Sequence, residues 1–299
     1  MNILKKSPLS FDKYHGNGND FIFISYSAFI KSLPLEDLCR FTRHYCDRNK
    51  GIGADGVVFY EVAQKISVLI INSDGSVAAT CGNALRCLGL ALLRAGSWTG
   101  DDSIPVHDAH SGKVFATLYS AHFDATQPEQ GVIDVGMGKE QVVLQSPLDS
   151  KALVDFKLSL AADPIYVALE NPHWIFLAPE FAHFSPSDFY AFGEYAQNKL
   201  PAFSLQNKNI PLSNIGMLSP GKSPSEWNLT VYERGAGLTL CCGSGATAAR
   251  IALEHMHTKI TSLKEVRFSM PGGVVSILNG ETQRILRGPA QWVFAGANL

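Results

Sequence analysis

Two cysteines in this sequence have contexts that suit acid–base chemistry. Cys81 and Cys242 each come directly before a glycine and an apolar run that is expected to form a helix. The backbone N–H groups at a helix start, together with the positive end of the helix dipole, favour a thiolate. The same N–H groups are suited to holding a carboxylate. One thiolate and one thiol on opposite faces of a planar carbanion are what a two-base inversion of an amino-acid α-carbon requires.

The segments around the two cysteines form an internal repeat. CGNALRCLGLAL from Cys81 aligns with CGSGATAARIAL from Cys242, and Gly112 follows Cys81 at the same distance as Gly273 follows Cys242. Each half therefore runs from a cysteine through an apolar helix to a glycine and a strand. We expect two pseudo-symmetric halves, joined near residues 125–130, whose cysteines face each other across a cleft.

The elements that must position the cysteines are mostly short strands. β-branched and aromatic runs between turn residues predict strands at 21–24, 57–60, 68–71, 114–119, 132–135, 165–169, 174–177, 229–231, 266–268 and 274–278. Helices are expected at 34–45, 83–95, 186–198 and 245–256. Those at 83–95 and 245–256 are apolar on nearly every side, which predicts that they are buried all round. Sheets wrapped around central helices are the expected result.

The composition argues against several classes of protein. The chain has 299 residues, of which 46% are hydrophobic and 17% charged, as in ordinary globular domains. A net charge of −2 without a basic stripe argues against a nucleic-acid partner. The apolar runs are too short for a membrane span or a signal peptide, so we expect a cytoplasmic protein with reduced thiols.

The remaining cysteines and one glycine-rich motif have simpler interpretations. Cys39, Cys46, Cys87 and Cys241 are expected to be packing residues. No metal is predicted, because the C-x₂-C pairs typical of zinc sites are absent. A redox pair stays open, whereas a cysteine hydrolase would leave the second repeated cysteine unexplained. GIGADG at residues 51–56 fits a dinucleotide-binding pattern, but a strand follows where a helix is needed, so a turn is predicted.

Longer motifs resemble those of the diaminopimelate epimerases. They follow that family's order and are YHGNGNDF at 14–21, CDRNKGIGADG at 46–56, NSDGSVAATCGNALRC at 72–87, NPH at 171–173, YERGAGLTLCCGSG at 232–245 and GPAQWVFAG at 288–296. The resemblance implies an α+β fold of two pseudo-symmetric domains, each a strongly bent mixed β-sheet or barrel around a central buried helix. The final strand would return to the first domain, giving domains of residues 1–125 plus 287–299 and of residues 126–286. It also implies interconversion of LL- and meso-diaminopimelate in lysine and peptidoglycan precursor biosynthesis, with no cofactor, neither metal nor pyridoxal phosphate.

The resemblance assigns roles to individual residues. The catalytic set is Cys81 and Cys242 as acid and base, with His173 and Glu233 as a polar pair beside the second cysteine. In that pair a basic partner would help to hold the thiolate. The substrate-binding set is Asn19, Asn72, Asn171, Asn214 and Arg234, with Gly82, Asn83, Gly243 and Ser244 as the backbone cradle for the reacting α-carboxylate. Arginine is a natural bidentate clamp for a carboxylate, and asparagine amides both donate and accept.

Some positions depart from the family pattern. Ala84, Gly56, Leu238 and Glu170 stand where glycine, glutamine, glutamate and glycine are common, and residues 77–80 lack an acidic residue. We therefore expect the amino-acid headgroup to be read strictly and the distal end loosely, with glutamate as a weaker substrate. A racemase of another amino acid on the same fold and a non-catalytic amino-acid-binding protein are the alternatives. A small-molecule amino acid is the predicted partner, without nucleic acid or membrane, and a homodimer is left open.

Overall fold

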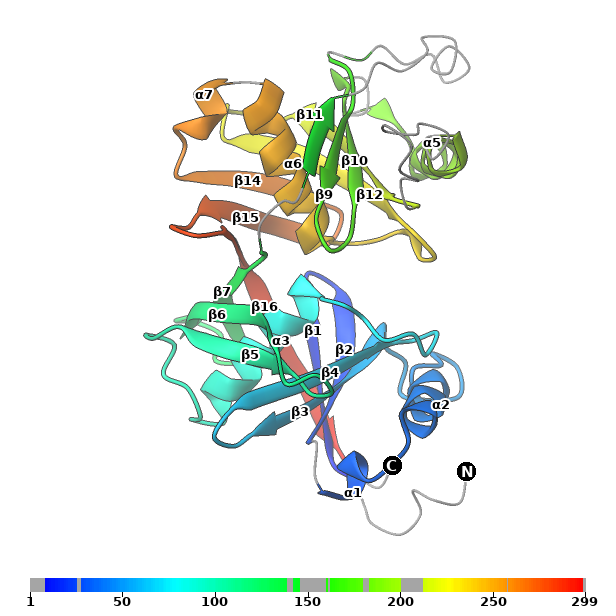
Figure 1. Ribbon diagram of the computed structural model, residues 1–299, viewed down its shortest axis with the longest axis vertical. Coiled ribbons are helices and arrows are strands. Elements are labelled where there is room, and N and C mark those ends of the chain that lie inside the picture. The colour runs from blue at the N-terminus through cyan, green and yellow to red at the C-terminus, as the bar shows by residue number, and fades with distance from the viewer. Residues whose placement is uncertain are drawn as a thin grey trace. The chain divides into compact units, whose positions relative to one another are not determined.

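The computed structural model describes residues 9–25, 28–138, 142–145, 160, 162–179, 183–199, 212–256 and 258–297. The chain divides into two units (Figure 1). The first unit comprises Met1–Gly136 and Arg287–Leu299, and the second comprises Met137–Leu286. The chain therefore leaves the first unit once and returns to it at the end.

The first unit is built mainly from strands. Its elements are β1 (Phe11–Gly16), β2 (Asn19–Ser25), α1 (Ala28–Lys31), α2 (Leu35–Tyr45), β3 (Gly56–Val62), β4 (Ile66–Asn72), α3 (Gly82–Arg94), β5 (Ile104–Asp108), β6 (Val114–Phe123), β7 (Gln130–Gly136) and most of β16 (Arg284–Gly296). The strands follow one another in the order β1 to β7, then β16, and β16 also pairs with β1. This last pairing closes the sheet into a barrel.

Alternating side chains explain the layers of the first unit. Ile22 and Ile24 of β2 join a core cluster with Leu38 and Phe41 of α2. Successive side chains of a strand point to opposite faces, so Phe23 lies on the other face of β2. The buried helix α3 packs against β1, β2, β6 and β7. The strands are apolar on both faces because α2 covers one side of the sheet and α3 fills the other.

The second unit repeats this plan. Its elements are β8 (Val142–Gln145), β9 (Ile165–Ala168), β10 (His173–Leu177), α5 (Pro186–Lys199), β11 (Asn214–Pro220), β12 (Glu226–Glu233), β13 (Gly237–Leu238), α6 (Gly243–Met256), α7 (Thr258–Thr261), β14 (Glu265–Met270) and β15 (Gly273–Asn279). The sheet runs in the order β16, β15, β14, β12, β11, β10, β9, β8, with β13 beside β12. Parallel pairs such as β10 with β11 and antiparallel pairs such as β11 with β12 make it a mixed sheet.

Two helices again lie on the two faces of this sheet. Ile175 and Leu177 of β10 belong to a core cluster with the α6 residues Ala246 and Leu253. The intervening Phe176 belongs to a different cluster, which contains residues of α5. The buried central helix is therefore α6, and α5 covers the opposite face of the same strands.

The structure confirms the predicted fold class and the predicted buried helices, which are α3 and α6. It corrects the predicted junction at residues 125–130, where the chain instead makes the turn between β6 and β7. Asp124 N–H donates to the carbonyl of Gln130, and β7 pairs with β6. A short polar segment suits a hairpin turn as well as a linker. The first boundary therefore lies after Gly136 rather than at residue 125.

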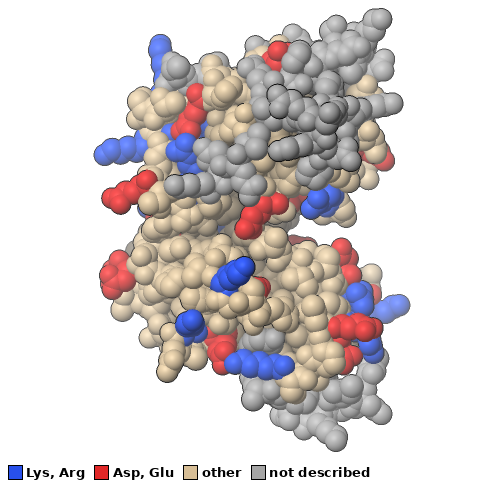
Figure 2. All heavy atoms as spheres, viewed as in Figure 1, with Lys and Arg blue, Asp and Glu red and all other residues tan. Residues whose placement is uncertain are grey.

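Two further observations concern the charges on the surface and the apolar character of the helices. On the face shown in Figure 2, the described lysine and arginine side chains are interspersed with aspartate and glutamate, and neither sign forms a continuous patch. Within the described residues, no helix is both long and apolar enough to cross a bilayer.

Candidate active site

Cys81 lies at the start of the central helix of the first unit. It is half-buried and directly precedes α3, with an extended backbone conformation of φ −147° and ψ 102°. Its carbonyl accepts the first helical hydrogen bond, from Leu85 N–H at 2.9 Å. Gly82 and Asn83, which belong to the predicted carboxylate cradle, lie in the first turn of α3, where the positive end of the helix dipole favours an anion. The first half of the predicted cradle is thus at a helix N-terminus.

Asn19 and Asn72 lie at the same end of the first barrel. Asn19 begins β2 and Asn72 ends β4, and β3 lies between these strands. Gly56 of β3 pairs with Phe21 on one side and with Asn72 on the other. This register brings the start of β2 and the end of β4 to one edge. The side-chain amide of Asn72 donates to Ser76 Oγ at 3.0 Å.

Cys242 occupies the corresponding position in the second unit, directly before α6. Its side chain is buried, with 4% of its surface exposed. The sulfur accepts a hydrogen bond from Gly245 N–H at 3.3 Å and lies 3.4 Å from Ser244 Oγ. Ser244 Oγ in turn lies 3.1 Å from His173 Nε2. Three predicted residues, Cys242, Ser244 and His173, therefore form one polar chain.

Burial is the main influence on the pKa values of Cys242 and His173 in this polar chain. It raises the pKa of Cys242 well above its ordinary value, and the negative charge of Glu233 raises it further. Hydrogen bonds from Ser244 and Gly245 act in the opposite direction but do not outweigh burial. Burial also lowers the pKa of His173 to about 3, so this imidazole is neutral near pH 7.

These directions oppose two expectations from the sequence. The helix start was expected to favour a thiolate at Cys242, and His173 was expected to be a basic partner that helps to hold it. Burial favours the protonated thiol at Cys242 and the neutral imidazole at His173. The desolvation cost of a charge there opposes the stabilisation that the helix dipole offers a thiolate. Burial therefore favours the thiol form of Cys242 over the thiolate.

The other predicted residues of the second unit gather at the ends of its central strands. Asn214 begins β11, directly beside His173 of the parallel strand β10. Its side-chain oxygen accepts a hydrogen bond from Arg234 N–H at 2.8 Å. The guanidinium of Arg234 is exposed and donates to the carbonyl of Leu212 at 3.2 Å. Asn214 thus fixes the backbone from which Arg234 projects.

Glu233 and Asn171 complete this group of residues. Glu233 ends β12, and its carboxylate accepts a hydrogen bond from the hydroxyl of Thr239 at 2.5 Å. Asn171 is half-buried in the turn that leads into β10. Glu233 directly precedes Arg234, whose N–H bonds to Asn214. Asn171 directly precedes Pro172, whose carbonyl accepts a hydrogen bond from Asn214 N–H at 2.9 Å.

The sequence interpretation missed two buried arginines that hold the central helices in place. Arg86 of α3 is fully buried and donates to Asn17 Oδ1 at 2.7 Å and to the carbonyl of Pro289 at 3.1 Å. Asn17 lies in the turn before Asn19, so this side chain ties the cysteine-bearing helix to that turn. A charged residue within an otherwise apolar helix was the signal that could have identified it.

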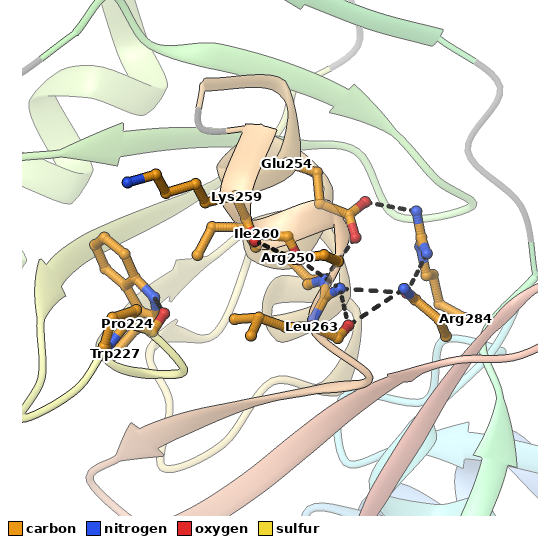
Figure 3. A network of polar contacts seen from close by, with 10 residues as sticks. Pro224, Trp227, Arg250, Glu254, Lys259, Ile260, Leu263 and Arg284 are labelled. Carbon is orange, nitrogen blue, oxygen red and sulfur yellow. Dashed lines mark hydrogen bonds and ion pairs between the residues drawn. The ribbon is translucent and has the colours of Figure 1, made fainter.

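Arg250 has a similar role on α6 (Figure 3). Its guanidinium donates to Glu254 Oε1 at 2.7 Å and to the carbonyls of Ile260 at 3.1 Å and Leu263 at 2.7 Å. The second oxygen of Glu254 accepts a hydrogen bond from Arg284 at 2.6 Å. This network anchors α6 to the segment around α7 and to the start of β16.

Comparison with known proteins identifies the family. The family model for diaminopimelate epimerase matches residues 11–140. A diaminopimelate epimerase of Acidiphilium cryptum is 30% identical, over 96% of this chain and 95% of its own length. One of Xanthomonas campestris pv. campestris is 31% identical, with the same coverage. Among solved structures, a phenazine biosynthesis protein from Bacillus anthracis matches with a TM-score of 0.68 at 11% identity, over 98% of this chain and 99% of its own, and so shares the fold. The chain belongs to the diaminopimelate epimerase family, and it is an isomerase.

Proposed function

We propose that this protein interconverts LL- and meso-2,6-diaminopimelate by a two-base mechanism in which Cys81 and Cys242 act on the same α-carbon. The reaction would serve lysine and peptidoglycan precursor biosynthesis, and it would need no cofactor. One observation carries the proposal: in each unit a cysteine directly precedes the buried central helix. Membership of the family supports the substrate.

The chemistry follows from the two helix starts. The thiolate of one cysteine removes the α-proton, and the electron pair of the broken C–H bond delocalises into the α-carboxylate. N–H groups of Gly82, Asn83, Gly243 and Ser244 stabilise the negative charge that develops there. The thiol of the other cysteine then gives its proton to the opposite face. Burial favours the thiol form of Cys242, which suits this side chain to the role of proton donor in one direction of the reaction.

The polar chain behind Cys242 gives this thiol a defined orientation. Ser244 Oγ lies within reach of both the sulfur and His173 Nε2, and Gly245 N–H also points at the sulfur. When Cys242 loses its proton, these groups remain as hydrogen-bond partners for the thiolate. In the reverse direction the two cysteines exchange roles, so a partner set that serves both forms of the thiol is an advantage.

The remaining polar residues are proposed to read the substrate. Arg234 would bind the distal carboxylate, and the amides of Asn19, Asn72, Asn171 and Asn214 would bind the amino groups and the carboxylates. Leu238 pairs with Tyr232 in the hairpin that follows Glu233, so an apolar side chain stands close to this group. A pocket with fewer polar partners discriminates less, and we propose slow turnover of glutamate in addition.

The test combines α-proton exchange in D₂O with cysteine variants. Cys81→Ser and Cys242→Ser should each lower epimerisation of LL-diaminopimelate by several orders of magnitude, because a serine hydroxyl is a far weaker acid. Cys39→Ser is the matched control, since Cys39 is a half-buried cysteine of α2. Wild-type turnover in either of the first two variants would refute the mechanism.

Substrate specificity is tested with the wild-type protein. We expect kcat/KM to fall in the order LL-diaminopimelate, L-glutamate, L-leucine. A rate for leucine equal to that for diaminopimelate would show that the distal carboxylate is not read, and the role of Arg234 would be wrong.

A further inference from the structure

The glycine-rich segment of residues 51–56 lies in close contact with the end of α2. Gly51 lies so close to the end of α2 that a Cβ atom there would stand 2.6 Å from the carbonyl oxygens of His44 and Tyr45. The N–H groups of Ile52 and Gly53 both donate to Tyr45, at 2.9 and 3.0 Å. The segment is thus a fixed connection between α2 and β3.

Four charged side chains surround the end of this segment. Asp20 forms ion pairs with Lys13 Nζ at 2.7 Å and with Arg48 at 2.7 Å. Arg48 also pairs with Asp55 at 2.8 Å. We call these residues the Asp20–Asp55 cluster: Lys13, Asp20, Arg48 and Asp55. Two carboxylates and two cations balance, and Lys13 is almost fully buried.

Asp55 also makes a closed set of bonds with two strands. Its carboxylate accepts a hydrogen bond from Asp20 N–H at 3.0 Å, and its own N–H donates to the carbonyl of Asp20 at 2.8 Å. Its carbonyl accepts a hydrogen bond from Ser73 N–H at 2.9 Å. Asp55 therefore joins the residue after Asn19 to the residue after Asn72. These are the two asparagines at this edge of the barrel.

We propose that Asp55 is a positioning residue that sets the spacing between Asn19 and Asn72 and thereby the affinity of the first unit for substrate. This inference rests on the proposed function, in which both asparagines bind the substrate. Each asparagine is one residue away from a backbone group bonded to Asp55, so a shift of Asp55 moves both. Positioning groups of this kind act on binding geometry without touching the substrate.

The carboxylate of Asp55 matters because it accepts the hydrogen bond of Asp20 N–H and forms an ion pair with Arg48. Without it, Asp20 N–H loses its acceptor and Arg48 keeps a single anionic partner. Burial tends to raise the pKa of Asp20, but hydrogen bonds from Arg48 and Lys13 outweigh it and lower that pKa. Asp20 therefore stays charged and keeps its ion pair with Arg48. The start of β2 then keeps one of its two hydrogen bonds to residue 55, so its position relative to β4 is less firmly fixed.

The test measures KM and kcat for LL-diaminopimelate in three variants. Asp55→Ala should raise KM about tenfold, the effect of about one charge-assisted hydrogen bond, with kcat nearly unchanged. Asp55→Asn keeps an acceptor for Asp20 N–H and loses only the ion pair, so KM should rise about threefold. Glu61→Gln, which breaks the exposed ion pair of Glu61 with Lys31, is the control and should retain the wild-type KM.

The outcomes separate this inference from the proposed function. A wild-type protein that epimerises no diaminopimelate refutes the proposed function itself. An active wild-type protein with an unchanged KM in Asp55→Ala refutes the role of Asp55. If Asp55→Ala does not fold, a folded Asp55→Asn variant with a wild-type KM refutes it instead. An equal rise of KM in Glu61→Gln would also overturn it, because the effect would then not be specific to the cluster.

Discussion

Gly245 offers a direct way to disturb one of the two proposed catalytic thiols, Cys242, without removing it. A Cβ atom at this position would stand 2.8 Å from Val231 Cγ2 and 3.3 Å from Cys242 Sγ. Carbon atoms pack best at about 3.5 Å, so Gly245→Ala requires a displacement of about 0.7 Å. Val231 is fully buried in the core around α6 and has little room, so part of the displacement should fall on the sulfur.

Two opposing terms set the expected loss of stability. Alanine stabilises a helix by at most about 1 kcal/mol relative to glycine. An added methyl group in a packed core costs about 1–3 kcal/mol. The net destabilisation should be about 1 kcal/mol, or a fall of about 2–4 °C in the melting temperature of the second unit. The effect on kcat should be larger, about tenfold or more, because sub-ångström misplacement of a reacting group slows proton transfer.

Gly89→Ala is the matched control for this variant. Gly89 lies in α3, and a Cβ atom there would stand 2.7 Å from Ile133 Cγ2, a contact of the same kind away from either predicted catalytic thiol. Both variants should lose similar stability in a calorimetric scan, but only Gly245→Ala should lose epimerase activity beyond twofold or so. If the two variants lose equal activity, the reasoning from the position of Cys242 Sγ is wrong.

Two further predictions concern protonation in the second unit. Glu233→Gln removes a charge that raises the pKa of Cys242, so alkylation of this thiol should begin at lower pH, whereas Ser244→Ala should move it to higher pH. Iodoacetamide labelling, followed peptide by peptide by mass spectrometry, measures both, and shifts in the same direction would contradict the assignment. His173 takes up a proton in the unfolded chain near pH 6.5 but in the folded protein only near pH 3. Its contribution to stability is therefore complete above pH 6.5 and falls below it by about 1.4 kcal/mol per pH unit. The free energy of unfolding, measured with urea at pH 6.5 and 5.0, should differ less between the two pH values in His173→Gln than in the wild type. An equal difference would show that His173 is not the group responsible.

Much of the fold could be predicted because local patterns agree with it. Apolar runs such as Val57–Phe59 within β3 and the all-apolar helix α6 correspond to layers that are buried on both sides. The local pattern did not predict the strand β16, because Gly288 and Pro289 interrupt its sequence, and only the family resemblance implied a final strand there. Proline cannot donate to a neighbouring strand, so a proline usually argues against a central strand. Its place between β7 and β1 follows from tertiary pairing.

The residue types of the candidate site could be predicted from the sequence, but the protonation states of its side chains could not. The cysteines, glycines and asparagines stand in recognisable motifs, and the repeat marks the two helix starts. The protonation of Cys242 and His173 depends on how much water the surrounding strands exclude, which no local pattern records. The hydrogen-bond partners of Arg250 could not be predicted from a local pattern either, because Ile260 and Leu263 lie beyond the end of α6.

The position of β16 in the chain also sets an order of events during synthesis. The first barrel needs this strand to join β7 to β1, yet the whole second unit, Met137–Leu286, is translated in between. At about 5–20 residues per second, roughly 8–30 s pass before β16 emerges from the ribosome. Throughout this interval β1 and β7 present open edges to other nascent chains. A message cut short before β16 would therefore yield both cysteines and a barrel that never closes.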